Sequence, residues 1–346
     1  MKSQGSEVLV TGASGFIGIN VVRCLAEKGY NVLGTTRRKG GPGPLVDYYL
    51  EGLGDKVTWI TLDLRDSEKV MSIAKTHEIM GIIHTAVFTP ASRELEQTRS
   101  RDILESNLMG TVNTLEIAKE AGVDRYVYVS SSGVYGSTGN LDAPVLESSS
   151  APYLQTSGFY RTTKIACERL TEHYNRLFPI TTTSMRVGAP YGSMERPTGS
   201  RHRMGPIYRL LELILTEKRD NLRVKQLDYT RDWTFVTDTA SCLIAGFETA
   251  APISGLYNVS CGVNSSLREI LTSIQEVPGV DFEWEEVQDD MNADFPDSVG
   301  IRRGPLSIEK ARKELGFEPR YDLKRGIRAY LDWWWDVTEK GLWPER

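Results

Sequence analysis

The sequence has little of what a disulfide framework, a zinc site or a membrane anchor requires. Its four cysteines are scattered over 346 residues and never form a Cys-x-x-Cys pair, so neither a disulfide scaffold nor a zinc site is indicated. No apolar run approaches the roughly 20 residues that a membrane span needs. The apolar run at residues 8–10 is also too short for the core of a signal peptide. We therefore expect a cytoplasmic protein without membrane association.

The sequence also lacks a large excess of charge of either sign. It has 41 lysines and arginines against 46 aspartates and glutamates, a formal net charge of −5, and 40% of its residues are apolar. These proportions are ordinary for globular proteins, and they argue against a disordered chain or a nucleic-acid-binding polycation. Since 346 residues exceed the usual domain of roughly 100–200, we expect one large domain or two fused ones.

Histidines are few, and none has the spacing of metal ligands. His77, His173 and His202 stand far apart in the sequence, so we predict no metal. His84 ends an apolar run, and we expect it to be a hydrogen-bonded strand-end histidine rather than a catalytic base.

Short β-branched runs alternate with longer helical patterns through the first half of the chain. Six mostly apolar runs are typical of strands buried on both faces. They span residues 8–11, 31–35, 57–62, 81–85, 126–130 and 181–186. Helical patterns cover residues 16–28 and 103–121, and a glycine follows each. Repeated strand–helix–strand units predict right-handed crossovers and an α/β fold with a doubly wound parallel sheet, a Rossmann fold.

After about residue 186 this rhythm breaks into a stretch with several prolines and glycines. The change predicts a dinucleotide-binding domain at residues 1–185 and a smaller C-terminal substrate-binding region at residues 186–346. Residues 255–259 look like another strand, so we expect about residues 231–262 to return to the main domain.

A glycine-rich turn follows the first predicted strand and opens the first predicted helix. Gly12 permits a tight turn, Gly15 lets the backbone approach a pyrophosphate, and Gly18 brings the helix close to the strand. The helix N-terminus then faces the anion. This context predicts a dinucleotide phosphate loop rather than an ordinary turn. The loop residues expected to contact the cofactor are Gly12, Ser14, Gly15, Phe16, Ile17 and Gly18.

The end of the second predicted strand lacks a carboxylate. In dinucleotide-binding folds a carboxylate at this place accepts the ribose 2′-hydroxyl of NAD, whereas an arginine pairs with the 2′-phosphate of NADP. This chain has Arg37 and Arg38 there, and a guanidinium offers planar, charge-assisted hydrogen bonds to a phosphate. We therefore expect NAD(P), with NADP favoured over NAD through Arg37. The alternative is a pair of solvated loop arginines.

Tyr160 and Lys164 stand four residues apart, on one face of a predicted helix. A free tyrosine has a pKa of about 10, and a nearby ammonium lowers that pKa by stabilising the phenolate, which makes Tyr160 a usable acid/base. The spacing alone is common. Its weight comes from the strand that ends in Ser130, Ser131 and Ser132, because hydroxyls at the carboxyl edge of a parallel sheet lie where ligands bind.

Eight ordered motifs over nearly the whole chain resemble the extended short-chain dehydrogenase/reductase family, the NAD(P)-dependent epimerases and dehydratases. Each motif occurs in the order that this family has. They are the glycine loop at residues 11–18, Asp63-Leu64, residues 82–86, Asn107 with Gly110-Thr111, residues 130–136, Tyr160 with Lys164, residues 231–236, and residues 311–319.

The resemblance implies a role for each matching residue. Tyr160 transfers the proton, Lys164 lowers its pKa and holds the nicotinamide ribose, and Ser131 orients the substrate oxygen. Asn107 supports a proton-relay water. The remaining residues so implied are Asp63 and Leu64 at the adenine, Thr85 and Ala86 along the cofactor, and Ser132, Arg186 and Arg231 near the substrate. For Ser132, a hydrogen bond that caps the strand end is an equal alternative. The resemblance also implies a homodimer through the helices that contain Asn107 and Tyr160.

Two departures from the family pattern bear on the reaction. The family's 4,6-dehydratases have Asp-Glu directly after the catalytic hydroxyl, as acid and base for β-elimination, whereas this chain has Ser132-Gly133. Dehydration is therefore disfavoured. The family's epimerases usually recycle tightly held NAD, but the NAD-type carboxylate is missing. We therefore expect net reversible hydride transfer at a secondary alcohol or ketone of a sugar, sugar nucleotide or related hydroxylated compound.

Two alternative functions stay open. An epimerase with tightly bound NAD carries out the same half-reaction, and Arg231-Asp232-Trp233 resembles the sugar-nucleotide branch. A non-catalytic NADP sensor is disfavoured, since it has no need of a matched acid/base pair. Three arginines within residues 190–203 fit an anionic substrate and a solvated surface loop equally well.

Overall fold

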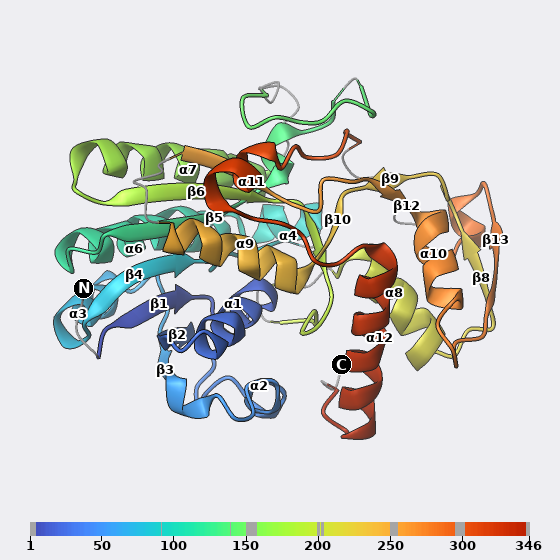
Figure 1. Cartoon of the computed structure of the whole chain (residues 1–346), viewed down its shortest axis with the longest axis horizontal. Helices are drawn as coiled ribbons and strands as arrows, with labels where there is room; N and C mark the ends of the chain where they lie inside the picture. The colour runs from blue at the N-terminus through green and yellow to red at the C-terminus, as the bar shows by residue number, and fades with distance from the viewer. Residues whose placement is uncertain are drawn as a thin grey trace.

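The central sheet has seven parallel strands in the order β11-β6-β5-β4-β1-β2-β3 (Figure 1). The computed structural model describes residues 5–90, 92–138, 140–149, 158–198, 201, 204–249, 255–294 and 302–343. The strand order reverses between β1 and β4, as in a Rossmann fold. The predicted fold class is confirmed.

The strands of this sheet match the apolar runs of the sequence within two residues at each end. They are β1 (Glu7–Thr11), β2 (Asn31–Thr36), β3 (Val57–Thr61), β4 (Ile79–His84), β5 (Arg125–Ser131), β6 (Thr181–Val187) and β11 (Gly255–Val259). The inner strands are buried on both faces because helices cover each side, whereas the edge strand β3 is partly exposed. The predicted return strand, β11, pairs with β6.

Helices cover both faces of the sheet. One face carries α1 (Phe16–Glu27), α9 (Val236–Glu248) and α11 (Glu309–Leu315); the other carries α3 (Ser67–Thr76), α6 (Gly110–Glu120) and α7 (Phe159–Leu177) (Figure 1). Successive side chains of β1 serve opposite faces. Val8 and Val10 pack with Ile19 of α1, whereas Leu9 packs with Leu115 of α6. Each face of the sheet is thus packed against its own apolar layer of helices, and the two layers hold the strands in position.

The predicted helix at residues 103–121 is interrupted. It consists of α5 (Ser100–Leu104), a π-helical turn η2 (Glu105–Met109) and α6. A π-helical turn adds a residue to the helix and re-aims its side chains, and such turns occur often at functional sites. Asn107 lies at the centre of η2 and is buried.

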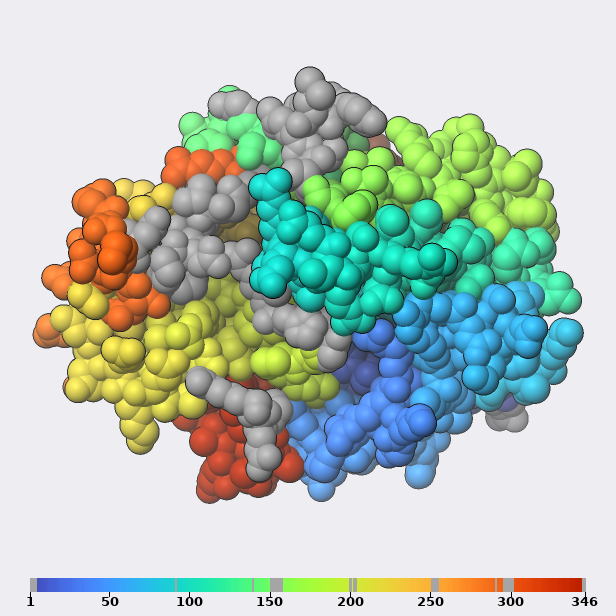
Figure 2. Space-filling view, turned by 180° about the vertical axis from the view of Figure 1, so that it is seen from behind, coloured from blue at the N-terminus to red at the C-terminus, as the bar shows by residue number. Residues whose placement is uncertain are grey.

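A second apolar cluster holds the smaller C-terminal part together. Its elements are β7 (Ala189–Tyr191), α8 (Pro206–Leu211), η5 (Glu212–Thr216), β8 (Asn221–Val224), β9 (Thr230–Arg231), β10 (Trp233–Phe235), β12 (Ser265–Ser266), α10 (Leu267–Gln275), β13 (Glu283–Glu286) and α12 (Leu323–Glu339). Trp334 of α12 is buried against Tyr208 and Tyr330. Viewed from behind, this part forms the yellow and orange surface beside the blue and green nucleotide-binding half (Figure 2).

Short elements complete the described chain. They are α2 (Pro44–Tyr49), η1 (Gly54–Lys56), α4 (Arg93–Thr98), η3 (Ser132–Tyr135) and η6 (Asp290–Asn292). Of the helices within the described ranges, none is both long and apolar enough to cross a membrane.

Candidate active site

A cavity of about 850 Å³ opens at the carboxyl ends of β1, β2, β3 and β4. This is the switch point of the sheet, where ligands of open α/β folds bind, and its size suits a small-molecule cofactor. Eleven of the predicted cofactor residues line it. They are Gly12, Ser14, Gly15, Phe16, Ile17, Gly18, Arg37, Asp63, Leu64, Thr85 and Ala86. The structure thus brings these residues together, and their contact with a dinucleotide stays a prediction.

The glycine loop has the geometry that close backbone approach requires. Gly12 has a φ of +65°, and a Cβ there would lie 2.7 Å from the Cα of Ala86. A Cβ at Gly18 would lie 2.2 Å from the carbonyl oxygen of Gly12. Helix α1 begins at Phe16 with no side-chain cap and no acidic residue in its first turn. Its first N–H groups therefore stand at the cavity without a side-chain cap, an arrangement that favours an anion.

Replacing Gly18 by alanine is expected to distort this loop. The added Cβ meets backbone rather than a flexible side chain, so the variant should lose about 1–3 kcal/mol of stability and bind dinucleotide at least about tenfold more weakly. Thermal unfolding and a dinucleotide titration measure the two effects. Gly54→Ala is the control, because its Cβ would enter open space. Unchanged affinity in Gly18→Ala would contradict a tight loop-to-helix contact.

Arg37 and Arg38 line the cavity at the end of β2 and are exposed. The backbone N–H of Arg38 donates to Thr36 Oγ1 at 3.2 Å, and its guanidinium donates to the carbonyl oxygen of Pro42 at 3.4 Å. The cavity lining includes one carboxylate, Asp63, which follows β3 rather than β2. The lining therefore contains no carboxylate at the end of β2, the place where NAD-binding proteins of this fold have one. This agrees with the sequence.

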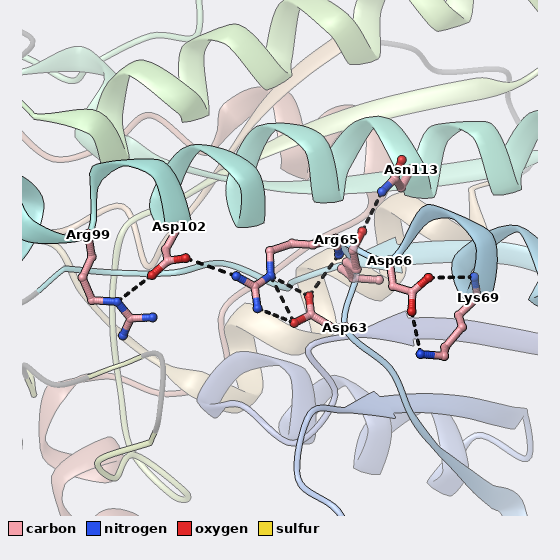
Figure 3. A network of polar contacts seen from close by, with 8 residues as sticks. Asp63, Arg65, Asp66, Lys69, Arg99, Asp102 and Asn113 are labelled. Carbon is pink, nitrogen blue, oxygen red and sulfur yellow. Dashed lines mark hydrogen bonds and ion pairs between the residues drawn. The ribbon is translucent and has the colours of Figure 1, made fainter.

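Asp63 belongs to a network of polar contacts that connects the segment after β3 to the helices α5 and α6 (Figure 3). Its carboxylate accepts from the Arg65 guanidinium at 2.7 Å, and this hydrogen bond lowers the pKa of Asp63. Arg65 also contacts Asp102 of α5 at 3.2 Å. Asn113 of α6 donates to the carbonyl oxygen of Leu64 at 2.7 Å. These contacts hold Asp63 and Leu64 in place where they line the cavity.

The structure brings Tyr160 and Ser131 together through a side-chain hydrogen bond. Tyr160 stands in the first turn of α7, and Ser131 ends β5. The Ser131 hydroxyl also accepts from the backbone N–H of Gly133 at 3.0 Å, which fixes its rotamer. The phenol expected to transfer the proton and the hydroxyl expected to orient the substrate are thus placed side by side, and both roles stay predictions.

Lys164 stands on α7, one helical turn after Tyr160, and is 3% exposed. Its Nζ donates to the carbonyl oxygen of Val129 at 2.6 Å and is 5.8 Å from the centre of the Tyr160 ring. Burial lowers the pKa of Lys164 to about 8. Burial also raises the pKa of Tyr160, against the effects of Ser131 and of the Arg201 charge. Lys164 is not among the groups that shift the Tyr160 pKa in this structure, and its expected effect on Tyr160 stays a prediction.

Asn107 has all of its amide atoms bound within the protein. Its Oδ1 accepts from the backbone N–H of Phe88 at 2.7 Å, and its Nδ2 donates to the carbonyl oxygen of Phe88 at 3.1 Å and to Thr163 Oγ1 at 3.3 Å. Phe88 lines the cavity, and Thr163 hydrogen-bonds to the backbone oxygen of Tyr160. The side chain therefore connects the cavity wall to α7, and the role expected from the resemblance, support of a relay water, stays a prediction.

The three predicted substrate residues besides Ser131 have different surroundings. Ser132 is buried, and its backbone oxygen and hydroxyl both accept from Arg303, which fits the strand-end cap. Arg231 lies with its Cζ 5.9 Å from the centre of the Trp233 ring. In the described part of the chain its buried Nε has no hydrogen-bond partner. Burial and the Arg231 charge lower the pKa of Arg303 to about 10.

Arg186 is engaged in the interior rather than at the cavity. Its guanidinium contacts both carboxylate oxygens of Glu168, at 2.9 and 2.7 Å, and donates to the carbonyl oxygen of Glu147 at 3.1 Å. The sequence motifs assign no role to Glu168, which also accepts from the Ser130 hydroxyl at 2.6 Å. The signal that could have identified Glu168 in the sequence is its position one helical turn after Lys164.

His84 is a hydrogen-bonded strand-end residue, as predicted. Its two ring nitrogens contact Thr11 Oγ1 at 2.6 Å and Thr111 Oγ1 at 3.0 Å, and burial lowers its pKa to about 3. Of the other histidines, His202 lies outside the described residues, as does Arg203. Within the described ranges, no group of three or more His, Cys, Asp or Glu residues is arranged to hold a metal ion.

Residues 8–260 match the profile of the NAD dependent epimerase/dehydratase family. The chain belongs to this family. This assignment confirms the resemblance on which the roles of Tyr160, Lys164 and Ser131 were expected, and those individual roles stay predictions.

Relatives within the family include both epimerases and a dehydratase. The UDP-glucose 4-epimerase of Mycolicibacterium smegmatis is 27% identical over 94% of this chain and 97% of its own length. The dTDP-glucose 4,6-dehydratase of Streptomyces antibioticus is 27% identical over 96% of this chain and 95% of its own.

Two solved structures are similar at 25% identity. MoeE5, in complex with UDP-glucuronic acid and NAD, has a TM-score of 0.76 over 97% of this chain and 100% of its own. The Thermus thermophilus UDP-glucose 4-epimerase complex with NAD has a TM-score of 0.73 over 94% of this chain and 98% of its own.

Sequence reasoning left the arginines of residues 190–203 between a ligand role and a solvated loop. In the structure Arg201 pairs with Glu195 at 2.5 Å and lines the cavity, so a ligand role for Arg201 stays a prediction. Glu195 is fully buried and also accepts from the backbone N–H of Gly205 at 2.8 Å. Arg201, whose side chain is 26% exposed, therefore pairs with a fully buried carboxylate beside the cavity.

Proposed function

We propose that the protein is a nucleotide-sugar 4-epimerase in which Tyr160 takes a proton from the sugar hydroxyl and returns it. The observation that carries this proposal is the Ser131–Tyr160 pair at the end of β5, in a chain that matches UDP-sugar 4-epimerases over nearly their full length. Ser132-Gly133, in place of an Asp-Glu pair, supports epimerisation over dehydration.

The residues at the cavity fit a dinucleotide. Gly12 and Gly18 leave room that a Cβ would fill, and α1 offers uncapped N–H groups to a pyrophosphate. A bound nicotinamide supplies the hydride acceptor and donor. Ser131 orients the sugar oxygen, Tyr160 holds or releases the proton at its phenolic oxygen, and Lys164 holds the ribose. Arg231, whose Nε has no hydrogen-bond partner among the described residues, is the cation that would bind a diphosphate.

A net oxidoreductase that uses NADP is the second candidate. Arg37 and Arg38 support it, because they stand at the β2 end of the cavity without a carboxylate there. The NAD bound in similar structures supports the epimerase instead. The two candidates differ in whether free cofactor is consumed.

The distinguishing experiment follows both the sugar and the cofactor. Purified protein is denatured to identify any released nicotinamide nucleotide, and the folded protein is incubated with UDP-glucose or UDP-glucuronate. We expect the 4-epimer by NMR with no net change in the absorbance of reduced cofactor. Steady formation of reduced cofactor with no epimer would refute epimerisation and favour the second candidate.

Replacing Arg37 by alanine tests the cofactor preference. If Arg37 pairs with a 2′-phosphate, the variant should bind NADP about tenfold or more weakly while NAD affinity is unchanged, since a charge-assisted hydrogen bond is lost. Parallel calorimetric titrations with NAD and NADP measure this difference. Lys39→Ala is the control, because Lys39 is exposed and does not line the cavity. Equal NADP affinity in wild type and Arg37→Ala would remove the argument for NADP.

A further inference from the structure

Arg196 is a buried cation at the wall of the cofactor cavity. It is 8% exposed and lines the cavity beside Ser14 and Gly15. Its Nη2 donates to the carbonyl oxygen of Ser14 at 2.9 Å, and its Nη1 donates to the carbonyl oxygen of Met194 at 3.0 Å. Ser14 and Arg196 are 182 positions apart in the sequence. The substrate-binding region thus reaches onto the phosphate loop.

The charge of Arg196 has no counter-ion in the described part of the chain. Both of its acceptors are neutral carbonyls. The adjacent Glu195 binds Arg201 and the N–H of Gly205 through Oε1, and within the described residues its buried Oε2 has no hydrogen-bond partner and forms no ion pair with Arg196. Burial lowers the pKa of Arg196 to about 10, and the charge of Arg38, another cation, adds to this effect. A buried guanidinium without an anion carries a large desolvation cost, and it has N–H donors beyond the two in use.

The surroundings of Arg196 are those of an anion site. Arg37 and Arg38 line the same cavity, and the uncapped N-terminus of α1 opens into it. The carboxylate of the lining, Asp63, is already paired with Arg65. The cavity therefore concentrates positive charge near the glycine loop, which suits a multiply charged anion of the size of a nucleotide phosphate.

We propose that Arg196 is a cofactor-binding residue whose guanidinium pairs with a phosphate of the dinucleotide. This inference rests on the proposed dinucleotide cofactor. The phosphate belongs either to the pyrophosphate, which NAD and NADP share, or to the 2′-phosphate, which NADP alone has. Because Pro197 and Thr198 line the cavity next to Arg196, the pairing also ties the substrate-binding segment to the loaded cofactor.

The test compares Arg196→Met and Arg196→Lys with wild type. Arg196→Met keeps the length of the side chain and removes its charge, so NAD, NADP or both should bind about tenfold or more weakly. Arg196→Lys keeps the charge but loses the planar fork, and its affinity should lie between the two. Arg169→Met, at an exposed ion pair of α7, is the control and should bind like wild type. Affinities are measured by calorimetry on protein stripped of nucleotide.

Thermal unfolding separates this role from a structural one. Because an unpaired buried charge is removed, stripped Arg196→Met should unfold at or above the wild-type temperature, and the rise in Tm on adding dinucleotide should shrink. Equal loss of NAD and NADP affinity assigns the pyrophosphate, and loss confined to NADP assigns the 2′-phosphate. A lower Tm with undiminished affinity in both variants would overturn the inference. Wild-type protein that binds neither nucleotide would instead overturn the proposed dinucleotide site itself.

Discussion

Tyr160→Phe is expected to lower turnover by about 10²–10⁴-fold while dinucleotide affinity stays within about twofold. The substitution removes the phenolic oxygen alone, so Ser131 loses its hydrogen-bond partner and the sugar hydroxyl loses its proton acceptor. The glycine loop and the cavity wall, which are separate from this oxygen, are unchanged. Single-turnover kinetics and a nucleotide titration on the same preparation measure the two quantities.

The pH dependence of turnover gives this prediction a second readout. Burial raises the pKa of Tyr160, so the phenol is protonated at neutral pH and must lose its proton to act as a base. Oxidation of the sugar hydroxyl should therefore speed up as the pH rises above neutrality in wild type. The residual activity of Tyr160→Phe should lack this increase.

Tyr174→Phe is the matched control, because it removes a phenolic oxygen from the same helix. Tyr174 donates to Glu116 of the neighbouring helix α6 at 2.5 Å. It should retain wild-type turnover and the same pH profile. Equal loss of turnover and nucleotide affinity in Tyr160→Phe would instead mean that Tyr160 supports the cavity rather than the proton transfer.

The parts of this fold that the sequence predicted are those determined by local patterns. Strands buried on both faces must be apolar along their whole length, so β1 and β5 could be located within two residues. The glycine loop was predictable because Gly12 and Gly18 stand where a Cβ would meet backbone. Both features can be recognised in short stretches of sequence, although the Cβ at Gly12 would meet the distant Ala86.

The parts that the sequence did not predict depend on contacts between distant segments. The π-helical turn at Glu105–Met109 keeps the apolar pattern of a helix, so periodicity could not reveal it. The contact between Arg196 and Ser14 spans 182 positions. The direction of the Lys164 ammonium is set by a carbonyl oxygen of β5, which no side-chain pattern encodes. The homodimer, the cytoplasmic location and the domain boundaries stay predictions of the sequence.

The Arg186–Glu168 pair shows why an arginine at a strand end is a poor guide to substrate contact. Such a residue stands at the ligand-binding edge of the sheet, and the family resemblance implied that Arg186 lies near the substrate. In the structure Arg186 instead pairs with the carboxylate of Glu168, which belongs to α7. Both side chains are at least 89% shielded from solvent. A guanidinium that is satisfied inside the protein has little left to offer a substrate.

Glu168→Gln is accordingly expected to destabilise the fold by about 3–5 kcal/mol, because the Arg186 charge stays buried without its partner. Glu172→Gln, one turn later on α7 at an exposed pair, should cost about 1 kcal/mol or less. Urea unfolding measures both.

The double variant Arg186→Met, Glu168→Leu removes both charges and should regain most of the lost stability, since apolar side chains of similar size replace a buried pair at little cost. A regained stability with unchanged KM identifies the pair as structural. If stability returns but KM rises about tenfold or more, Arg186 also contacts the substrate, and the role implied by the resemblance holds beside the ion pair.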